Sequence, residues 1–200
     1  MSPRSEATST SAPPTTSSTT LATTKNPPRN AEGFQRVTQT ETSITLRWDK
    51  VDNILNYILN GKEINVPASD KTEVEYTISN LTNGTKYNFQ LFTVFEDVRS
   101  SGVNLTAVTA PLNAEDFRSV EQTETSITLG WKNVDVTFNY TLVFNGKDIN
   151  FTASDETEVK HTISKLTNGT KYNFQLFTVF EYAKSPGVNL TAVTGKMLSL

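Results

Sequence analysis

The chain has 200 residues, enough for one large domain or two of ordinary size, and a net charge of −3 from 18 basic and 21 acidic residues. Apolar residues make up 36% and charged residues 20%, which excludes a membrane-embedded chain and disorder driven by charge. The basic residues are scattered, so we expect no nucleic-acid partner, and the absence of cysteine excludes disulfides, thiolate metal sites and cysteine nucleophiles.

Residues 1–25 are predicted to form a disordered Ser/Thr/Pro-rich stalk. From Ser5 to Thr24, 13 of 20 positions are Ser or Thr, with Pro13 and Pro14 among them. Such a segment buries too little apolar surface to offset its ordering entropy. The composition is typical of an O-glycosylated stalk, and an unmodified flexible linker is the alternative. Met1 and the residues after it resemble the edge of a partial gene model, so we expect a fragment of a longer protein.

The rest of the chain is an internal repeat of domain length. Residues 81–96 and 166–181 share the sequence LTNGTKYNFQLFTVFE, and GVNLTAVT recurs at 102–109 and 187–194. The offset is 83 residues early in the repeat and 85 later, which places two additional residues of the second copy between Tyr140 and Asn145. A period of this length is a whole domain rather than a solenoid unit. We therefore predict two domains, 26–110 and 111–195, followed by a tail at 196–200.

Within each copy the pattern predicts β-strands. Ile44, Leu46 and Trp48 alternate with polar residues, and Asn-Gly pairs punctuate such runs. Several short strands at this spacing are typical of a sandwich. The expected fold is all-β, with two tandem seven-stranded antiparallel immunoglobulin-like sandwiches. Pro111 makes the joint at Thr109-Ala110-Pro111 semi-rigid, because it fixes its own φ and biases Ala110 to an extended conformation.

These residues resemble the fibronectin type III family. The family pattern is a lone Trp that ends the second strand, followed by a Leu-x-x-Gly-Thr-x-Tyr stretch that opens a long strand. The resemblance implies that the Trp fills the space between the sheets and that the Tyr hydroxyl bonds the backbone upstream. The matching residues are Trp48, Leu81, Gly84, Thr85 and Tyr87 in the first copy, and Trp131, Leu166, Gly169, Thr170 and Tyr172 in the second.

The wording of the repeats also resembles the ectodomain repeats of receptor-type tyrosine-protein phosphatases of the eta/beta group. This resemblance implies a single-span membrane protein of the cell surface with a cytoplasmic phosphatase domain. That domain needs a cysteine, and the chain has none, so any phosphatase activity lies outside these residues. We expect no direct membrane insertion by this chain, since no window reaches the roughly 18 apolar residues of a spanning helix.

No residue pattern predicts catalysis, a cofactor or a metal. His161 is the one histidine and is expected at the surface or a strand edge. No Gly-x-Ser-x-Gly motif or glycine-rich phosphate loop occurs. The acidic pairs Asp70/Glu73 and Asp155/Glu158 are interpreted as solvated loop residues ahead of the next strand. We therefore predict a protein that is not an enzyme.

Sequons of the form Asn-x-Thr are the candidate modification sites. In several of them Asn and Thr share one strand face while an apolar residue takes the other, which is compatible with a glycan on the exposed face. The alternative is that they are only the polar half of amphipathic strands. Occupancy of both members of the closest pair, Asn80 and Asn83, is not expected. The seven candidates are Asn80, Asn83, Asn104, Asn139, Asn150, Asn168 and Asn189.

The two copies diverge most after the Trp and in the last hairpin, and loops on a rigid scaffold often carry function. Unconstrained drift is the alternative. Phe92 and Phe177 are expected on the outer face, as a contact patch or beneath neighbouring side chains. The divergent segments are residues 49–60 and 132–145 after the Trp, and 96–102 and 181–187 in the hairpin.

The leading hypothesis is a non-catalytic spacer or protein-interaction region in the ectodomain of a glycosylated receptor. The alternative is an accessory module of a secreted carbohydrate-active enzyme, and a third option is an intracellular structural array. Sequons and stalk favour the first. The sequence identifies neither a protein ligand nor an oligomeric state.

Overall fold

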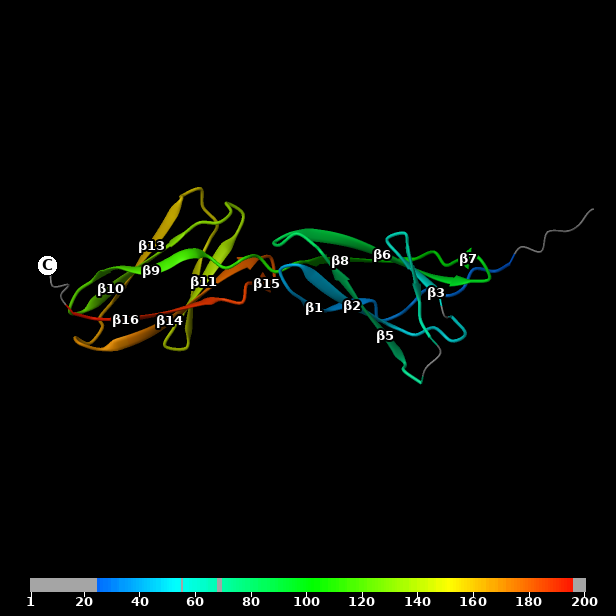
Figure 1. The fold of residues 1–200 in the computed structure, drawn as a ribbon, viewed down its shortest axis with the longest axis horizontal. Helices are drawn as coiled ribbons and strands as arrows, with labels where there is room; N and C mark the ends of the chain where they lie inside the picture. Colours follow the sequence, from blue (N-terminus) through cyan, green and yellow to red (C-terminus); the bar gives the residue numbers. More distant parts are fainter. Residues whose placement is uncertain (1–24, 55, 68–69, 196–200) are drawn as a thin grey trace, which may run out of the picture.

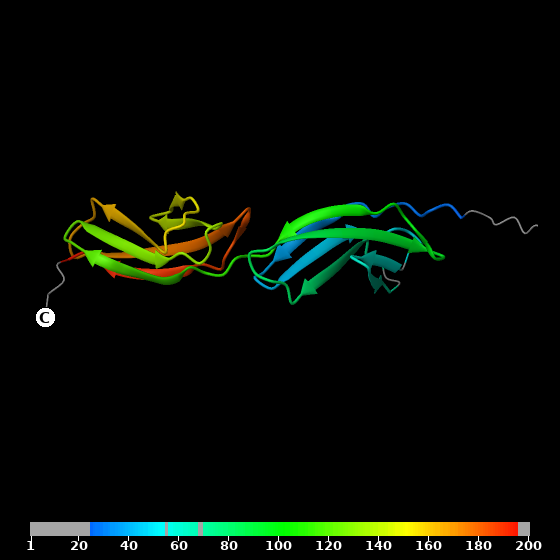
Figure 2. The ribbon, with the colours of Figure 1, turned by 90° about the horizontal axis from the view of Figure 1, so that it is seen from above.

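A computed structural model describes residues 25–54, 56–67 and 70–195, and these residues form two β-sandwiches arranged end to end (Figures 1 and 2). Every regular element among them is a strand. The stalk prediction falls on residues 1–24 and the tail prediction on 196–200, and both lie outside the described residues. None of the described residues belongs to a helix long and apolar enough to cross a membrane.

Domain 1 (residues 26–110) is built from two antiparallel sheets. The smaller sheet has the order β1-β2-β5, and the larger has the order β4-β3-β6, with β7 and β8 both paired to the far edge of β6. Together β7 and β8 make the seventh strand, interrupted at residues 100–102. The bounds are β1 Gln35–Gln39, β2 Ser43–Asp49, β3 Asn56–Leu59, β4 Lys62–Asn65, β5 Glu73–Ser79, β6 Lys86–Phe95, β7 Val98–Arg99 and β8 Val103–Val108.

Domain 2 (residues 111–195) repeats this topology. Its sheets have the orders β9-β10-β13 and β12-β11-β14, and β15 and β16 share the far edge of β14. Each domain is therefore the expected seven-stranded antiparallel sandwich. The bounds are β9 Glu115–Gln122, β10 Ser126–Lys132, β11 Asn139–Phe144, β12 Lys147–Phe151, β13 Glu158–Ser164, β14 Lys171–Phe180, β15 Ala183–Lys184 and β16 Val188–Val193.

Each sandwich has its own apolar core around a fully buried tryptophan. Alternate residues of β2 are buried, so Ile44, Leu46 and Trp48 face the opposite sheet. The Trp48 ring lies 5.4 Å from that of Tyr57 across the core, and Trp131 lies 5.7 Å from Tyr140 in domain 2. Two separate cores make each sandwich a packing unit of its own.

The signature tyrosines hold the turn that precedes the longest strand. The amide of Thr82 donates a hydrogen bond of 2.8 Å to the Tyr87 hydroxyl, and Thr167 donates one of 2.9 Å to Tyr172. Leu81 and Leu166, five and six residues before each tyrosine, pack against the edge of each core. These contacts fix the start of β6 and β14 and with it the register of the larger sheet.

The two copies differ in the length of one strand. β3 has four residues and β11 has six, because Val143 and Phe144 extend β11 before its turn. The alternation of faces is preserved since the difference is two residues. The Phe144 ring stacks on Phe174 at 5.0 Å, a position that the shorter β3 leaves without an equivalent.

Candidate functional site

The described residues offer no catalytic arrangement. They contain no group of three His, Cys, Asp or Glu side chains placed to hold a metal ion. His161 lies on β13 with its ring 5.0 Å from that of Phe151, and partial burial lowers the pKa of the imidazole. An imidazole that packs edge-on against an aromatic ring is a structural residue of the strand, as the sequence predicted.

The acidic pairs are solvent-facing, but their placement needs a correction. Only Asp70 and Asp155 lie in loops, whereas Glu73 and Glu158 are the first residues of β5 and β13. Each of these glutamates meets a basic side chain of a neighbouring strand, with Arg47 3.2 Å from Glu73. The hydrogen bond from Lys160 is the main cause that lowers the pKa of Glu158. The pairs are therefore cross-strand ion pairs rather than a catalytic dyad.

Most sequon asparagines lie on exposed surfaces. Asn80, Asn104, Asn139, Asn150, Asn168 and Asn189 are exposed, and Asn83 is half-buried. On β8, Asn104 and Thr106 face outward while Leu105 packs against the core between them. The sequon prediction is thus sterically compatible with the fold at six positions, and modification itself stays a prediction.

Two sequon side chains already take part in hydrogen bonds. The Asn139 carbonyl oxygen accepts a hydrogen bond of 2.7 Å from the Ala153 amide, and that of Asn150 accepts one of 2.9 Å from the Thr141 hydroxyl. A glycan is attached through the amide nitrogen, so these bonds remain available to a modified asparagine. Asn104 and Asn189 occupy matching positions on β8 and β16, so the two domains present the same candidate site twice.

The domains meet through the last hairpin of domain 2. The Val108 amide donates a hydrogen bond of 3.0 Å to the Tyr182 hydroxyl, and Arg36 lies over the Tyr182 ring at 5.1 Å. Beside them the Lys86 ammonium pairs with Glu181 at 2.5 Å. These three contacts join β1, β6 and β8 to the turn between β14 and β15, and they support a semi-rigid joint.

A phenylalanine completes the joint from the loop before β11. Phe138 is 7% exposed and packs on Phe180 at 5.4 Å. It also covers Gly84 of domain 1, where a β-carbon would collide with the Phe138 ring. Gly84 has φ of +52°, so its conformation and the close approach both favour glycine. Both divergent segments of domain 2 thus contribute to the domain joint.

The joint explains an asymmetry between the two domain ends. Val108 is fully buried, whereas its counterpart Val193 at the far end of domain 2 is 43% exposed. In the first copy Asp97 stands where the second has Tyr182. The sequence marked 181–187 as divergent, but nothing in it indicated that Tyr182 reaches Val108, 74 residues away.

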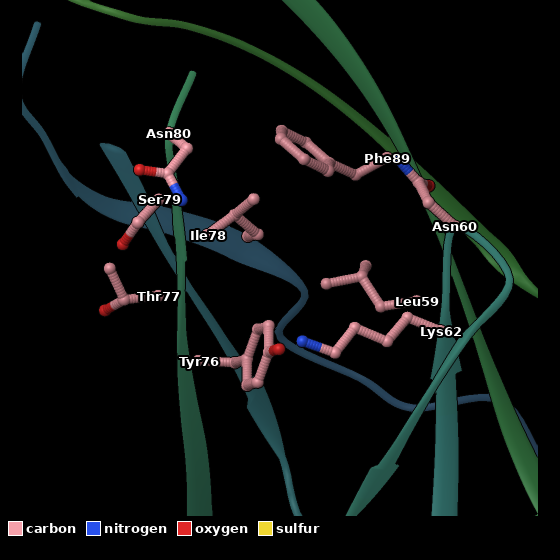
Figure 3. A pocket seen from close by; sticks show the side chains of 9 residues that line it. All are labelled: Leu59, Asn60, Lys62, Tyr76, Thr77, Ile78, Ser79, Asn80 and Phe89. Carbon is pink, nitrogen blue, oxygen red and sulfur yellow. The ribbon is translucent and has the colours of Figure 1, made fainter. Parts of the chain in front are cut away.

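A lateral groove opens between the two sheets of domain 1, with a volume of about 390 Å³ (Figure 3). It lies between β5, at the edge of one sheet, and the β3–β4 hairpin with β6 on the other side. In Figure 3 Asn80 and Phe89 lie at one end, and Tyr76 and Lys62 lie toward the other. The lining residues are Leu59, Asn60, Lys62, Tyr76, Thr77, Ile78, Ser79, Asn80 and Phe89.

Phe92 and Phe177 are covered by the seventh strand rather than open to solvent. A β-carbon on Gly102 would collide with the Phe92 ring, and one on Gly187 would collide with Phe177. The Lys184 ammonium also lies 5.5 Å from the centre of the Phe177 ring. Both phenylalanines are half-buried, so of the two interpretations the covered one fits the structure.

Two sandwiches of matching topology, each with a buried tryptophan and a tyrosine-held turn, define a tandem array of immunoglobulin-like β domains. The fibronectin type III domain model matches residues 26–104 and 110–191. The chain belongs to the fibronectin type III family.

Curated relatives share the repeats. The chain is 32% identical to tenascin of Gallus gallus over 52% of this chain and 6% of that protein. It is 31% identical to receptor-type tyrosine-protein phosphatase eta of Gallus gallus over 69% of this chain and 10% of the relative. Human tenascin-N is 27% identical over 70% of this chain and 12% of its own length. The chain thus spans about a tenth of the length of these relatives.

Solved structures show the same fold. A two-domain fibronectin type III segment from chicken tenascin is 20% identical, covers 82% of this chain and 99% of its own, and has a TM-score of 0.44. The first to third fibronectin domains of chicken CNTN1 are 11% identical, cover 85% of this chain and 68% of their own, and have a TM-score of 0.43.

Proposed function

We propose that this chain is a non-catalytic extracellular region of a glycosylated cell-surface receptor of the receptor tyrosine phosphatase kind. In this function the two domains act as a spacer and present repeated surfaces to a protein ligand. The observation that carries the proposal is the domain joint. Tyr182, Glu181 and Phe138 hold the sandwiches end to end and leave the outer strand faces open.

The geometry supports a mechanical and steric function. Contacts at the joint restrict bending, so the pair keeps its elongated arrangement (Figure 2). The exposed Asn104 and Asn189 repeat the same surface chemistry on both domains. Two identical surfaces on a stiff rod bind a multivalent partner more tightly than one, because the second contact is intramolecular.

The relatives supply the cellular context of the proposal. Receptor-type tyrosine-protein phosphatase eta matches over two thirds of this chain, and tenascins match with similar identity. The sequons add to this, since they are of use only to a chain that meets the glycosylation machinery. A receptor ectodomain accounts for both observations.

The test is secretion from a glycosylating animal cell behind an added signal peptide, followed by the intact mass before and after removal of N-linked glycans. Enzymatic removal converts a modified Asn to Asp, so peptide mapping identifies each occupied site. We expect loss of several glycan masses and conversion at Asn104 and Asn189. A secreted, folded chain without any modified sequon would overturn the extracellular proposal.

A further inference from the structure

The lateral groove of domain 1 is a place where the two copies differ in packing. In domain 2, Phe144 stands opposite Phe174 across the β11–β14 pair, and its ring stacks on Phe174 at 5.0 Å and tilts over Tyr172 at 5.7 Å. Phe89 of β6 corresponds to Phe174. Its opposite position on the β3 side falls on the turn residue Gly61, which has no side chain.

The space beside Gly61 is empty. A β-carbon built there would meet no atom within 4 Å. The groove beside it exposes the edges of Leu59, Ile78 and Phe89 between the sheets (Figure 3). Ile78 is only half-buried, whereas its counterpart Ile163 is 8% exposed. Domain 1 therefore has an opening where domain 2 has an aromatic ring.

A second difference between the copies lies at the same groove. Asn80 follows β5 and starts the sequon Asn80-Leu81-Thr82, whereas the equivalent residue after β13 is Lys165, in Lys165-Leu166-Thr167. Both residues have φ of +62°, so the backbone is the same and only the side chain differs. Asn80 is exposed and lines the groove, and its side chain is directed along β5 toward Ile78 (Figure 3). The copy with the open groove is thus the copy with the sequon at its rim.

We propose that Asn80 carries an N-linked glycan whose first N-acetylglucosamine lies in this groove and takes the place that Phe144 takes in domain 2. The proposal depends on the proposed extracellular function. In the modifying step the Asn80 amide nitrogen loses a proton and bonds C1 of the sugar. The bond from C1 to the pyrophosphate of a lipid-linked oligosaccharide breaks, and the lipid pyrophosphate leaves.

The chemistry of the groove fits a sugar. A pyranose ring has about the width of a phenyl ring, and its C–H face can pack on Ile78 and Leu59 as an aromatic face does. A volume of about 390 Å³ is in the range of ligand pockets. Asn60 forms a rigid wall, because its amide accepts from Gln90 at 2.8 Å and donates to the Asn88 carbonyl at 3.1 Å.

Polar groups at the far end provide partners for hydroxyl and acetamido groups. The Lys62 ammonium lies 5.4 Å from the centre of the Tyr76 ring and has donors to spare. Asn83, the other sequon of the pair, is half-buried in the turn beside Gly84 at the domain joint. Of the two, Asn80 is the site that the structure favours.

The experiment compares glycan states of the secreted chain in a Trp131→Phe background, so that the remaining Trp48 fluorescence reports domain 1. One sample is trimmed to a single N-acetylglucosamine and a second is fully deglycosylated. Thr82→Ala removes the sequon while it keeps the Asn80 side chain. Asn104→Gln is the matched control, since it removes an exposed sequon away from the groove.

We expect trimming to one sugar to leave the Tm of domain 1 unchanged. Thr82→Ala and full deglycosylation lower it by about 4 °C or more, and Asn104→Gln changes it by no more than about 1 °C. Insertion of Val-Phe after Leu59, as in β11, closes the groove and makes the Tm independent of the glycan.

Two results would overturn the inference while the proposed function stands. One is an unmodified Asn80 in a chain whose Asn104 and Asn189 are occupied. The other is an occupied Asn80 whose loss changes the Tm no more than Asn104→Gln does. A chain with no occupied sequon contradicts the proposed function itself, so the two failures are distinct.

Discussion

Tyr182 is the side chain through which domain 2 stabilises its neighbour, and its removal tests the joint. Tyr182→Ala deletes the acceptor of the Val108 amide and the ring beneath Arg36. A buried amide left without a partner costs about 1–3 kcal/mol, and an exposed cation–π contact contributes about 0.5–1 kcal/mol. Tyr182 is 51% exposed, so water reaches the vacated position and the lower half of the first range applies. The expected loss is about 2 kcal/mol.

Tyr182→Phe separates the two contributions. It keeps a ring beneath Arg36 and loses only the hydroxyl, so the expected loss is about 1 kcal/mol. The assay is urea unfolding of the two-domain chain, in which roughly 1–3 kcal/mol per molar of urea is typical. The midpoint of the less stable domain should fall by about 1 M for Tyr182→Ala and by about half as much for Tyr182→Phe.

The control is the same pair of substitutions in domain 2 alone, residues 111–195, which has its own core. Val108 and Arg36 are absent there, so the midpoint should not change. An equal drop in the isolated domain would show that Tyr182 acts within domain 2. Together with unchanged midpoints in the two-domain chain, it would refute the account of the joint.

Three further predictions concern the domains themselves. Trp131→Ala should destabilise domain 2 by about 3–5 kcal/mol in urea unfolding. Trp131→Phe should cost less, because the buried indole nitrogen has no hydrogen-bond partner among the described residues. Tyr87→Phe should cost domain 1 about 1 kcal/mol by the same assay, because the Thr82 amide loses its acceptor; an unchanged midpoint would contradict the role of this turn. Burial lowers the pKa of His161 below its ordinary 6.5, so the unfolded chain binds the proton more readily. Stability from this residue is complete above about pH 6.5 and declines as pH falls toward the folded pKa; midpoints measured between pH 5 and 7.5 should show the decline, and His161→Tyr should abolish it.

Much of the fold was predictable because the chain states it twice. The shared segment 81–96 and 166–181 became β6 and β14, the central strand of each larger sheet. Alternation around Trp48 placed it in the core, since a residue pattern of period two has only one way to face the opposite sheet. Local patterns of this kind are sufficient for strands and for the tyrosine-held turn.

The joint and the groove were not predictable in the same way. The Tyr182–Val108 bond joins residues 74 apart, and no local pattern records which end of one domain meets the other. The Tyr in place of Asp97 was the available signal, but divergence alone does not separate a contact from drift. The groove follows from the two-residue extension of β11, whose effect depends on which ring lies across the sheet at Phe144. Glu73 and Glu158 were placed in loops because acidic residues are common there, and cross-strand basic partners drew them into β5 and β13.

The account's central claim is an extracellular, glycosylated tandem spacer, and site-resolved glycan mapping of the secreted chain tests it most directly. The account predicts occupancy at the exposed asparagines of the strand faces, with Asn104 and Asn189 modified. A well-folded secreted chain in which all seven sequons are unmodified would contradict it.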